Sequence, residues 1–132
     1  MAYLLDTNIV SDLIRNPGGR AAARFEAAGE ENVAISIVVA AEMRFGAARS
    51  ASPVLAAKVD ALLERLTVLP LQPPADRHYA ELRAKLERAG TPVGANDMLI
   101  AAHALAVGRT LVTDNARAFA RIKGLKTENW LR

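Results

Sequence analysis

The stretch Tyr3-Leu4-Leu5-Asp6-Thr7-Asn8 decides the fold. Three apolar residues run directly into a carboxylate, and Thr7 or Asn8 can then accept hydrogen bonds from the free N–H groups of a helix beginning at Ile9. This pattern predicts a short buried strand, a turn and a helix. Asp6 then lies at the carboxyl end of a strand, where open α/β sheets bind ligands. Taken alone, Asp6 is better explained as a helix cap, and the case for a functional role depends on residues further along the chain.

The composition limits the classes of protein to which the chain can belong. With 132 residues, 52% of them hydrophobic, residues 1–132 form one domain that can bury a sizeable core. The chain has no cysteine, which excludes disulfides and thiolate chemistry and fits a reducing, cytoplasmic location. Its histidines are His78 and His103, so a zinc site would be unusually rich in carboxylates. The net charge of +3 suits an acidic partner such as RNA.

No part of the sequence predicts membrane insertion or export. The longest apolar stretch, Met98 to Val107, is interrupted by His103 and is too short to span a bilayer. No basic segment followed by an apolar run opens the chain, so we expect no signal peptide and no membrane partner.

Strand-like and helix-like segments alternate along the chain. After the first helix, helices are expected at 20–28, 37–48, 53–66, from about 75 onward, from 97 onward and at 115–122. Short strands are expected at 33–35, 67–71, 110–113 and 126–130. Pro70 places the strand 67–71 at an edge or at a strand end. This alternation is typical of the α/β class, and it predicts a three-layer α/β/α sandwich with a central, mainly parallel sheet.

Two of the expected helices are apolar on nearly every face. They are 37–48, for which Ser36 is the expected N-cap, and the helix that contains 98–107. Such helices must be buried or form an interface. We interpret His103, in the second of them, as a hydrogen-bonded core histidine.

Four carboxylates occupy positions that the fold would bring together. Asp6 and Asp114 follow strands, Asp97 lies in the first turn of a helix, and Glu42 lies inside an apolar helix that follows a strand. In a parallel sheet with right-handed crossovers, strand ends and the following helix starts share one edge. Without a counter-ion, each close pair would repel by about 4 kcal/mol at an effective dielectric of about 20. Mg²⁺ or Mn²⁺ would relieve this repulsion and could activate water against a phosphodiester.

Each of these acids also has a structural explanation. Asp97 could serve as a cap worth about 1 kcal/mol. Glu42 could form an ion pair with Arg49 or with Arg44, although residues two apart do not face each other on a helix.

The ordered motifs identify a family resemblance over nearly the whole chain. They are Leu4–Asn8, Ser36 with Glu42 on the next helix, Gly94–Ala104, Leu111–Asn115 and the ending from Gly124 to Trp130. Together they resemble a PIN domain, most closely the VapC-type toxins of bacterial VapBC toxin–antitoxin modules.

The resemblance implies a Mg²⁺-dependent (or Mn²⁺-dependent) ribonuclease toxin that cleaves a structured RNA. It also implies a cognate, VapB-like antitoxin that blocks the site, and a homodimer. The catalytic residues and metal ligands that it implies are Asp6, Glu42, Asp97 and Asp114, and the polar residues beside them are Asn8, Thr113 and Asn115.

Three other functions are weighed against this one. A receiver-like signalling domain with a Mg²⁺ pocket needs a lysine after a late strand, and Lys123 lies too far along a helix. An aspartate-nucleophile phosphatase needs a second aspartate after the first strand, where this chain has Asn8. A catalytically silent PIN-like module that only binds RNA would not need the full set of acids.

Overall fold

A parallel sheet forms the middle layer of the molecule in the computed structural model, which describes residues 1–91 and 93–132. The five strands lie in the order β3-β2-β1-β4-β5, and each neighbouring pair is parallel. Their bounds are β1 Tyr3–Leu5, β2 Val33–Ser36, β3 Thr67–Leu69, β4 Thr110–Val112 and β5 Thr127–Glu128. The strand that Pro70 follows is an edge strand, as the sequence predicts.

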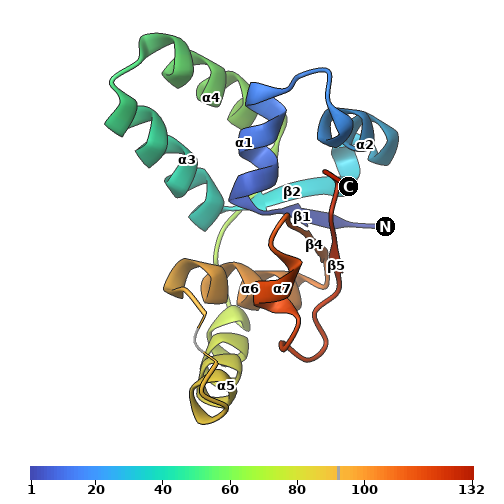
Figure 1. Cartoon of the computed structure of the whole chain (residues 1–132), viewed down its shortest axis with the longest axis vertical. Helices are drawn as coiled ribbons and strands as arrows, with labels where there is room; N and C mark the ends of the chain where they lie inside the picture. The colour runs from blue at the N-terminus through green and yellow to red at the C-terminus, as the bar shows by residue number, and fades with distance from the viewer. Residues whose placement is uncertain (92) are drawn as a thin grey trace.

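Helices cover both faces of the sheet, so the predicted three-layer α/β/α sandwich is confirmed. Figure 1 shows α1 to α4 on one side and α5 to α7 on the other. Their bounds are α1 Thr7–Arg15, α2 Arg20–Ala28, α3 Ile37–Ser50, α4 Pro53–Arg65, α5 Ala75–Arg88, α6 Ala95–Val107 and α7 Ala116–Phe119, with a short 3₁₀ helix at Glu30–Asn32. Within the described residues, no helix is both long and apolar enough to cross a membrane.

The first helix begins two residues earlier than the sequence predicts. It starts at Thr7 because Asp6 itself is the N-cap, and its Oδ1 accepts a hydrogen bond of 2.8 Å from the Thr7 backbone N–H. Leu4 and Leu5, which precede it in β1, are fully buried. A central strand therefore ends in a carboxylate that also starts a helix.

The end of the chain is less regular than expected. Helix α7 spans Ala116–Phe119 instead of 115–122, and the Asn115 side chain makes no capping bond. Strand β5 is confined to Thr127–Glu128 within the expected 126–130. The sequence also predicts a loop at 90–94, and residue 92 within this range lies outside the described residues.

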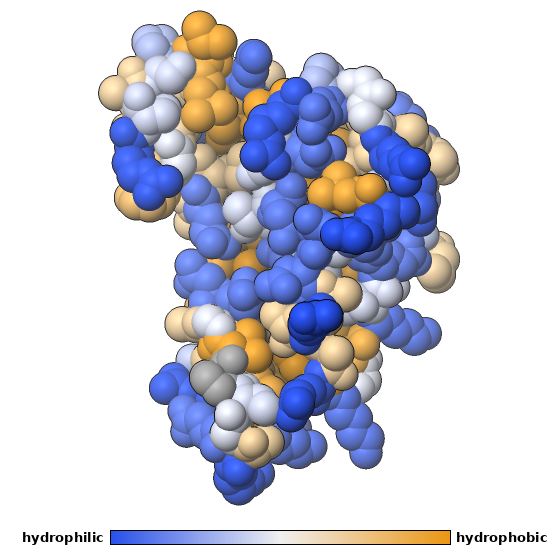
Figure 2. Space-filling view, in the orientation of Figure 1, coloured by the Kyte–Doolittle hydropathy of each residue, from blue (hydrophilic) through white to orange (hydrophobic). Residues whose placement is uncertain are grey.

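The two helices that are apolar all round have different environments. Helix α6 is largely buried between the sheet and α5. Helix α3 packs Val39 and Met43 into the core but leaves Phe45 63% and Ile37 46% exposed. Hydrophobic residues also reach the surface over α4, in the upper part of Figure 2. The paired helices α3 and α4 therefore carry apolar surface beyond what the core uses.

Candidate functional site

Asp6 is held firmly at the carboxyl edge of the sheet. Its Oδ2 accepts a hydrogen bond of 2.8 Å from the Thr113 hydroxyl and a longer one, 3.4 Å, from the Asn8 amide. Its backbone N–H donates to the Val112 carbonyl at 2.8 Å, which fixes the end of β1 against β4. Burial raises the pKa of Asp6, the bonds from Thr113 and Thr7 oppose this, and Glu42 adds to the rise.

Glu42 is held by a hydroxyl group instead of a cation. The Thr7 hydroxyl donates a hydrogen bond of 2.8 Å to Glu42 Oε1, joining α1 to α3. Neither ion pair considered for Glu42 forms, since Arg44 pairs with Asp60 at 2.7 Å and Arg49 lies over the Phe45 ring. The sequence predicts only a capping role for Thr7, and the one local signal for a role in the site is that Thr7 directly follows Asp6.

Asp97 lies close enough to both of these acids to interact with them. It is half-buried in the first turn of α6. Burial raises the pKa of Asp97 most, and the charges of Asp6 and Glu42 raise it further. The influence of Asp6 and Glu42 on Asp97 is consistent with the shared sheet edge that the topology predicts for the three acids.

Asp114 faces the end of the chain. Its Oδ1 accepts a hydrogen bond of 2.9 Å from the Asn129 amide and lies 3.7 Å from Arg132 Nε. Its backbone N–H donates to Asn8 Oδ1 at 3.0 Å. No local pattern in the sequence predicts Asn129 as a partner of an acid.

The three predicted polar neighbours form one network around Asp6. Asn8 bridges the Asp6 carboxylate and the Asp114 backbone. The Thr113 hydroxyl donates to Asp6 and accepts a bond of 3.0 Å from the Asn115 N–H. Because each group has a defined donor and acceptor role, the network fixes the orientation of the Asp6 carboxylate.

The chemistry of these side chains fits a hard divalent cation. All of the candidate metal-binding atoms are carboxylate oxygens, and hard cations prefer oxygen ligands. Of the ion pairs among described residues, none contains Asp6, Glu42 or Asp97. In the same part of the chain, no three acid or histidine side chains are gathered closely enough to hold an ion as they stand. Coordination by Asp6, Glu42, Asp97 and Asp114 therefore stays a prediction, and it requires side chains to rotate toward one another.

A cleft lies between α1, α3 and α4. It has a volume of about 330 Å³, and Thr7, Glu42 and Arg15 are among the residues that line it. Met43, Leu55 and Val59 provide apolar surface in this wall. The cleft thus combines apolar surface with an acid and a base.

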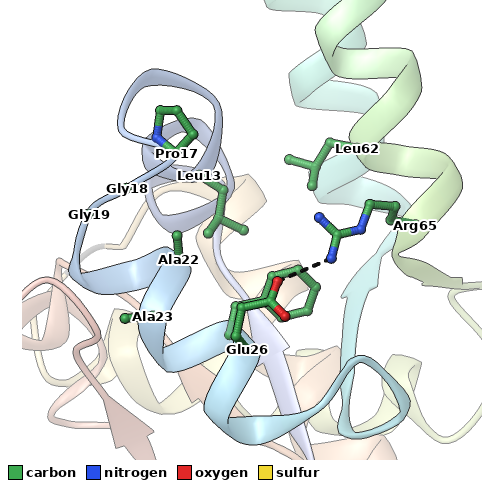
Figure 3. A pocket seen from close by; sticks show the side chains of 10 residues that line it. Leu13, Pro17, Gly18, Gly19, Ala22, Ala23, Glu26, Leu62 and Arg65 are labelled. Atoms are coloured by element: carbon green, nitrogen blue, oxygen red, sulfur yellow. Dashed lines mark hydrogen bonds and ion pairs between the residues drawn. The ribbon is translucent and has the colours of Figure 1, made fainter.

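A second cavity, of about 320 Å³, lies between the α1–α2 turn, α2 and α4. Figure 3 shows Glu26 and Arg65 pointing toward each other across it, and their charged groups are 3.3 Å apart. Arg65 also pairs with Glu30 and lies 5.3 Å from the centre of the Phe25 ring. These contacts tie α4 to α2, and none of the candidate acids of the functional site lines the cavity.

Comparison with known proteins agrees with this architecture. The family model described as the PIN domain matches residues 3–125. A protein named ribonuclease VapC2 from Haemophilus influenzae is 38% identical, and the match covers 99% of each chain. A protein named tRNA(fMet)-specific endonuclease VapC from Shigella flexneri is 37% identical over 98% of each chain.

Solved structures give the same result. The VapBC complex of Salmonella typhimurium bound to DNA contains a chain that is 37% identical to this one, with a TM-score of 0.92 and 98% of each chain covered. The VapBC2 complex of Rickettsia felis, bound to a DNA fragment from its promoter, gives a TM-score of 0.90 at 37% identity, covering 98% of this chain and 99% of that one. The chain therefore belongs to the PIN domain family and, within it, to the VapC ribonucleases of VapBC toxin–antitoxin systems.

Proposed function

We propose that this ribonuclease is a Mg²⁺-dependent (or Mn²⁺-dependent) endonuclease whose reaction takes place at Asp6, Glu42 and Asp97, with Asp114 as the fourth acid. The observation that carries the proposal is that Thr7 bonds to both Asp6 and Glu42, while neither of these acids nor Asp97 has a cationic partner among the described residues. Like charges in a partly buried site raise one another's pKa and favour a bound cation.

In this proposal, each residue of the site has its own role. Thr113 and Asn8 orient the Asp6 carboxylate, and Thr7 orients Glu42. Asp97, at the start of α6, completes the group. A divalent cation bound by these oxygens would supply activation of water and stabilisation of the leaving oxygen of the phosphodiester. Arg15 is in the wall of the adjoining cleft, and in this proposal it would contact a phosphate of the RNA.

We infer a structured RNA as the substrate, with initiator tRNA as the first candidate. The support is the name of the relative from Shigella flexneri, which is a tRNA(fMet)-specific endonuclease. The net charge of +3 favours a polyanionic substrate of any sequence, so the charge supports the class of substrate and not the particular tRNA.

We also propose a VapB-like antitoxin partner, a homodimer and a cytoplasmic location. Related structures are described as VapBC complexes, which supports the antitoxin. The exposed side chains of Ile37 and Phe45 on α3 provide apolar surface for a protein contact. Co-expression with the product of the adjacent antitoxin gene should relieve toxicity, and toxicity that persists would contradict the pairing.

The central experiment measures cleavage of purified initiator tRNA and elongator tRNAs by antitoxin-free protein. Cleavage should require Mg²⁺ or Mn²⁺ and stop with EDTA, and Asp97→Asn should be inactive. Full activity in EDTA would disprove the metal mechanism. Binding of tRNA without cleavage, in the presence of metal, would instead support the silent RNA-binding alternative.

A further inference from the structure

A buried hydrogen bond joins the two helices that carry Glu42 and Asp97. His103 Nδ1, on α6, lies 2.8 Å from Ser36 Oγ, and these residues are 1% and 0% exposed. Ser36 ends β2 and is the N-cap of α3, where its hydroxyl accepts a bond of 3.1 Å from the Val38 N–H. The bond therefore ties the first turn of α3 to the middle of α6.

The same number of residues separates each of the two acids from this bond. Glu42 follows Ser36 by six residues on α3, and Asp97 precedes His103 by six residues on α6. At 1.5 Å per residue, six residues correspond to about 9 Å along a helix axis. A shift of α3 against α6 at the bond would therefore also move the two acids relative to each other.

The imidazole ring bonds to Ser36 through Nδ1, and the Pro70 carbonyl is a second polar group near the ring. Among the described residues, His103 Nε2 has no hydrogen-bond partner of normal geometry. Burial lowers the pKa of His103, and only the nearby Pro70 carbonyl opposes this. An apolar side chain would fill the same space without the cost of burying a polar ring. What the imidazole adds is a directed contact between two helices.

We propose that His103 is a positioning residue of the ribonuclease site, which acts through Ser36 to set how Glu42 and Asp97 face each other. The inference rests on the proposed function, in which these two acids belong to one reacting centre. It predicts that losing the bond lowers kcat and weakens metal binding even where the protein remains folded. Small displacements of reacting groups can cost up to about 100-fold in rate.

A pair of amide variants separates the bond from the volume of the ring. In His103→Asn the amide nitrogen can take the place of Nδ1 and keep the contact with Ser36. In His103→Gln the amide nitrogen reaches the place of Nε2, and the contact is lost. Both variants remove the ring, so both are expected to melt at lower temperature than the parent. We expect kcat for RNA cleavage to fall about 10- to 100-fold in His103→Gln, with KM little changed, and to stay near the parent value in His103→Asn.

A second pair tests the same bond from the other side. Ser36→Ala removes the hydroxyl and also the cap of α3. Ser52→Ala is the matched control. Ser52 caps α4, where its hydroxyl accepts a bond of 3.2 Å from the Leu55 N–H, and it takes no part in the bond between Ser36 and His103. We expect kcat to fall in Ser36→Ala and to be unchanged in Ser52→Ala. Combining Ser36→Ala with His103→Gln should cost no more than the larger single effect.

A readout independent of activity is the rise in melting temperature when Mn²⁺ is added. This rise should be smaller than the parent's in His103→Gln and close to the parent's in His103→Asn. If the parent needs metal and the two amide variants have equal kcat values and equal responses to Mn²⁺, the proposed role of His103 is wrong and the proposed metal site still stands. A parent that is fully active in EDTA would overturn the proposed metal site, and the inference with it.

Discussion

The hydroxyl of Thr7 donates a hydrogen bond of 2.8 Å to Glu42 Oε1, across 35 positions of sequence. Thr7 is also the residue whose backbone N–H is capped by Asp6. One residue on the first turn of α1 thus contacts two of the candidate acids, one through its backbone and the other through its side chain. This places Asp6 and Glu42 in a defined relation before any cation or RNA is present.

The Thr7 hydroxyl should matter more for activity than for stability. Thr7→Val keeps the shape of the side chain and removes the donor, whereas Thr7→Ser keeps the donor. We expect Thr7→Val to lose about 0.5–1.5 kcal/mol of unfolding free energy and at least about tenfold in kcat, since Glu42 is no longer oriented. Steady-state cleavage and denaturant unfolding of both variants provide the check. Equal kcat values for the two variants would show that Glu42 does not depend on this bond.

Neutral substitution of two acids should separate a metal site from a scaffold. If Asp97 and Glu42 belong to a repelling cluster, Asp97→Asn and Glu42→Gln should melt in EDTA at or above the parent temperature. When Mg²⁺ is added, the melting temperature of each variant should rise less than that of the parent, because a ligand that binds only the folded state stabilises it by mass action. Thermal melts with EDTA and with Mg²⁺ decide this.

The scaffold alternative predicts the opposite pattern in the same melts. Loss of a cap would cost about 0.5–2 kcal/mol, and loss of one partner of a buried ion pair about 3–5 kcal/mol. A large drop for both variants in EDTA, with the parent's response to Mg²⁺ retained, would therefore assign these residues to the structure.

The stability of the metal-free protein should depend on pH through Asp97. The pKa of Asp97 is raised by burial and by the nearby acids, so the folded state binds its proton more readily than the unfolded state. Protonation of Asp97 therefore contributes to the stability of the folded state. This contribution is fully present below about pH 3.9, the pKa of an unperturbed aspartate, and is lost as the pH rises through the raised pKa. In EDTA, the difference in melting temperature between Asp97→Asn and the parent should therefore become more positive from pH 4 to pH 7. A difference that does not change with pH would mean that Asp97 is unperturbed in solution.

Much of the fold follows from short-range features of the sequence. The stretch that ends in Asp6 predicts a buried strand and then a helix because apolar runs and capping groups act within a few residues. The same reasoning predicts Ser36 as the cap of α3, and this is confirmed. The alternation of such units determines a parallel sheet, and the hand of its crossovers then brings Asp6, Glu42 and Asp97 to one edge.

The partners of these side chains were decided only by the tertiary structure. Thr113 and Asp6 are 107 residues apart, and His103 and Ser36 are 67 apart. The core position of His103 was predicted from its apolar helix, but its bond to Ser36 was not. Such contacts depend on strand register and helix packing, which no local pattern specifies.

Asp114 shows most clearly what local sequence patterns do not predict. Its position after a strand is a local property, and the sequence predicts it correctly. Its contact with Asn129 depends on how the last residues fold back beside β4, where Thr113 N–H donates to the Glu128 carbonyl at 2.9 Å. The sequence by itself determined which acids lie at the edge of the sheet. Their orientations required the tertiary structure, because a side chain turns toward whichever hydrogen-bond donors distant segments bring within reach.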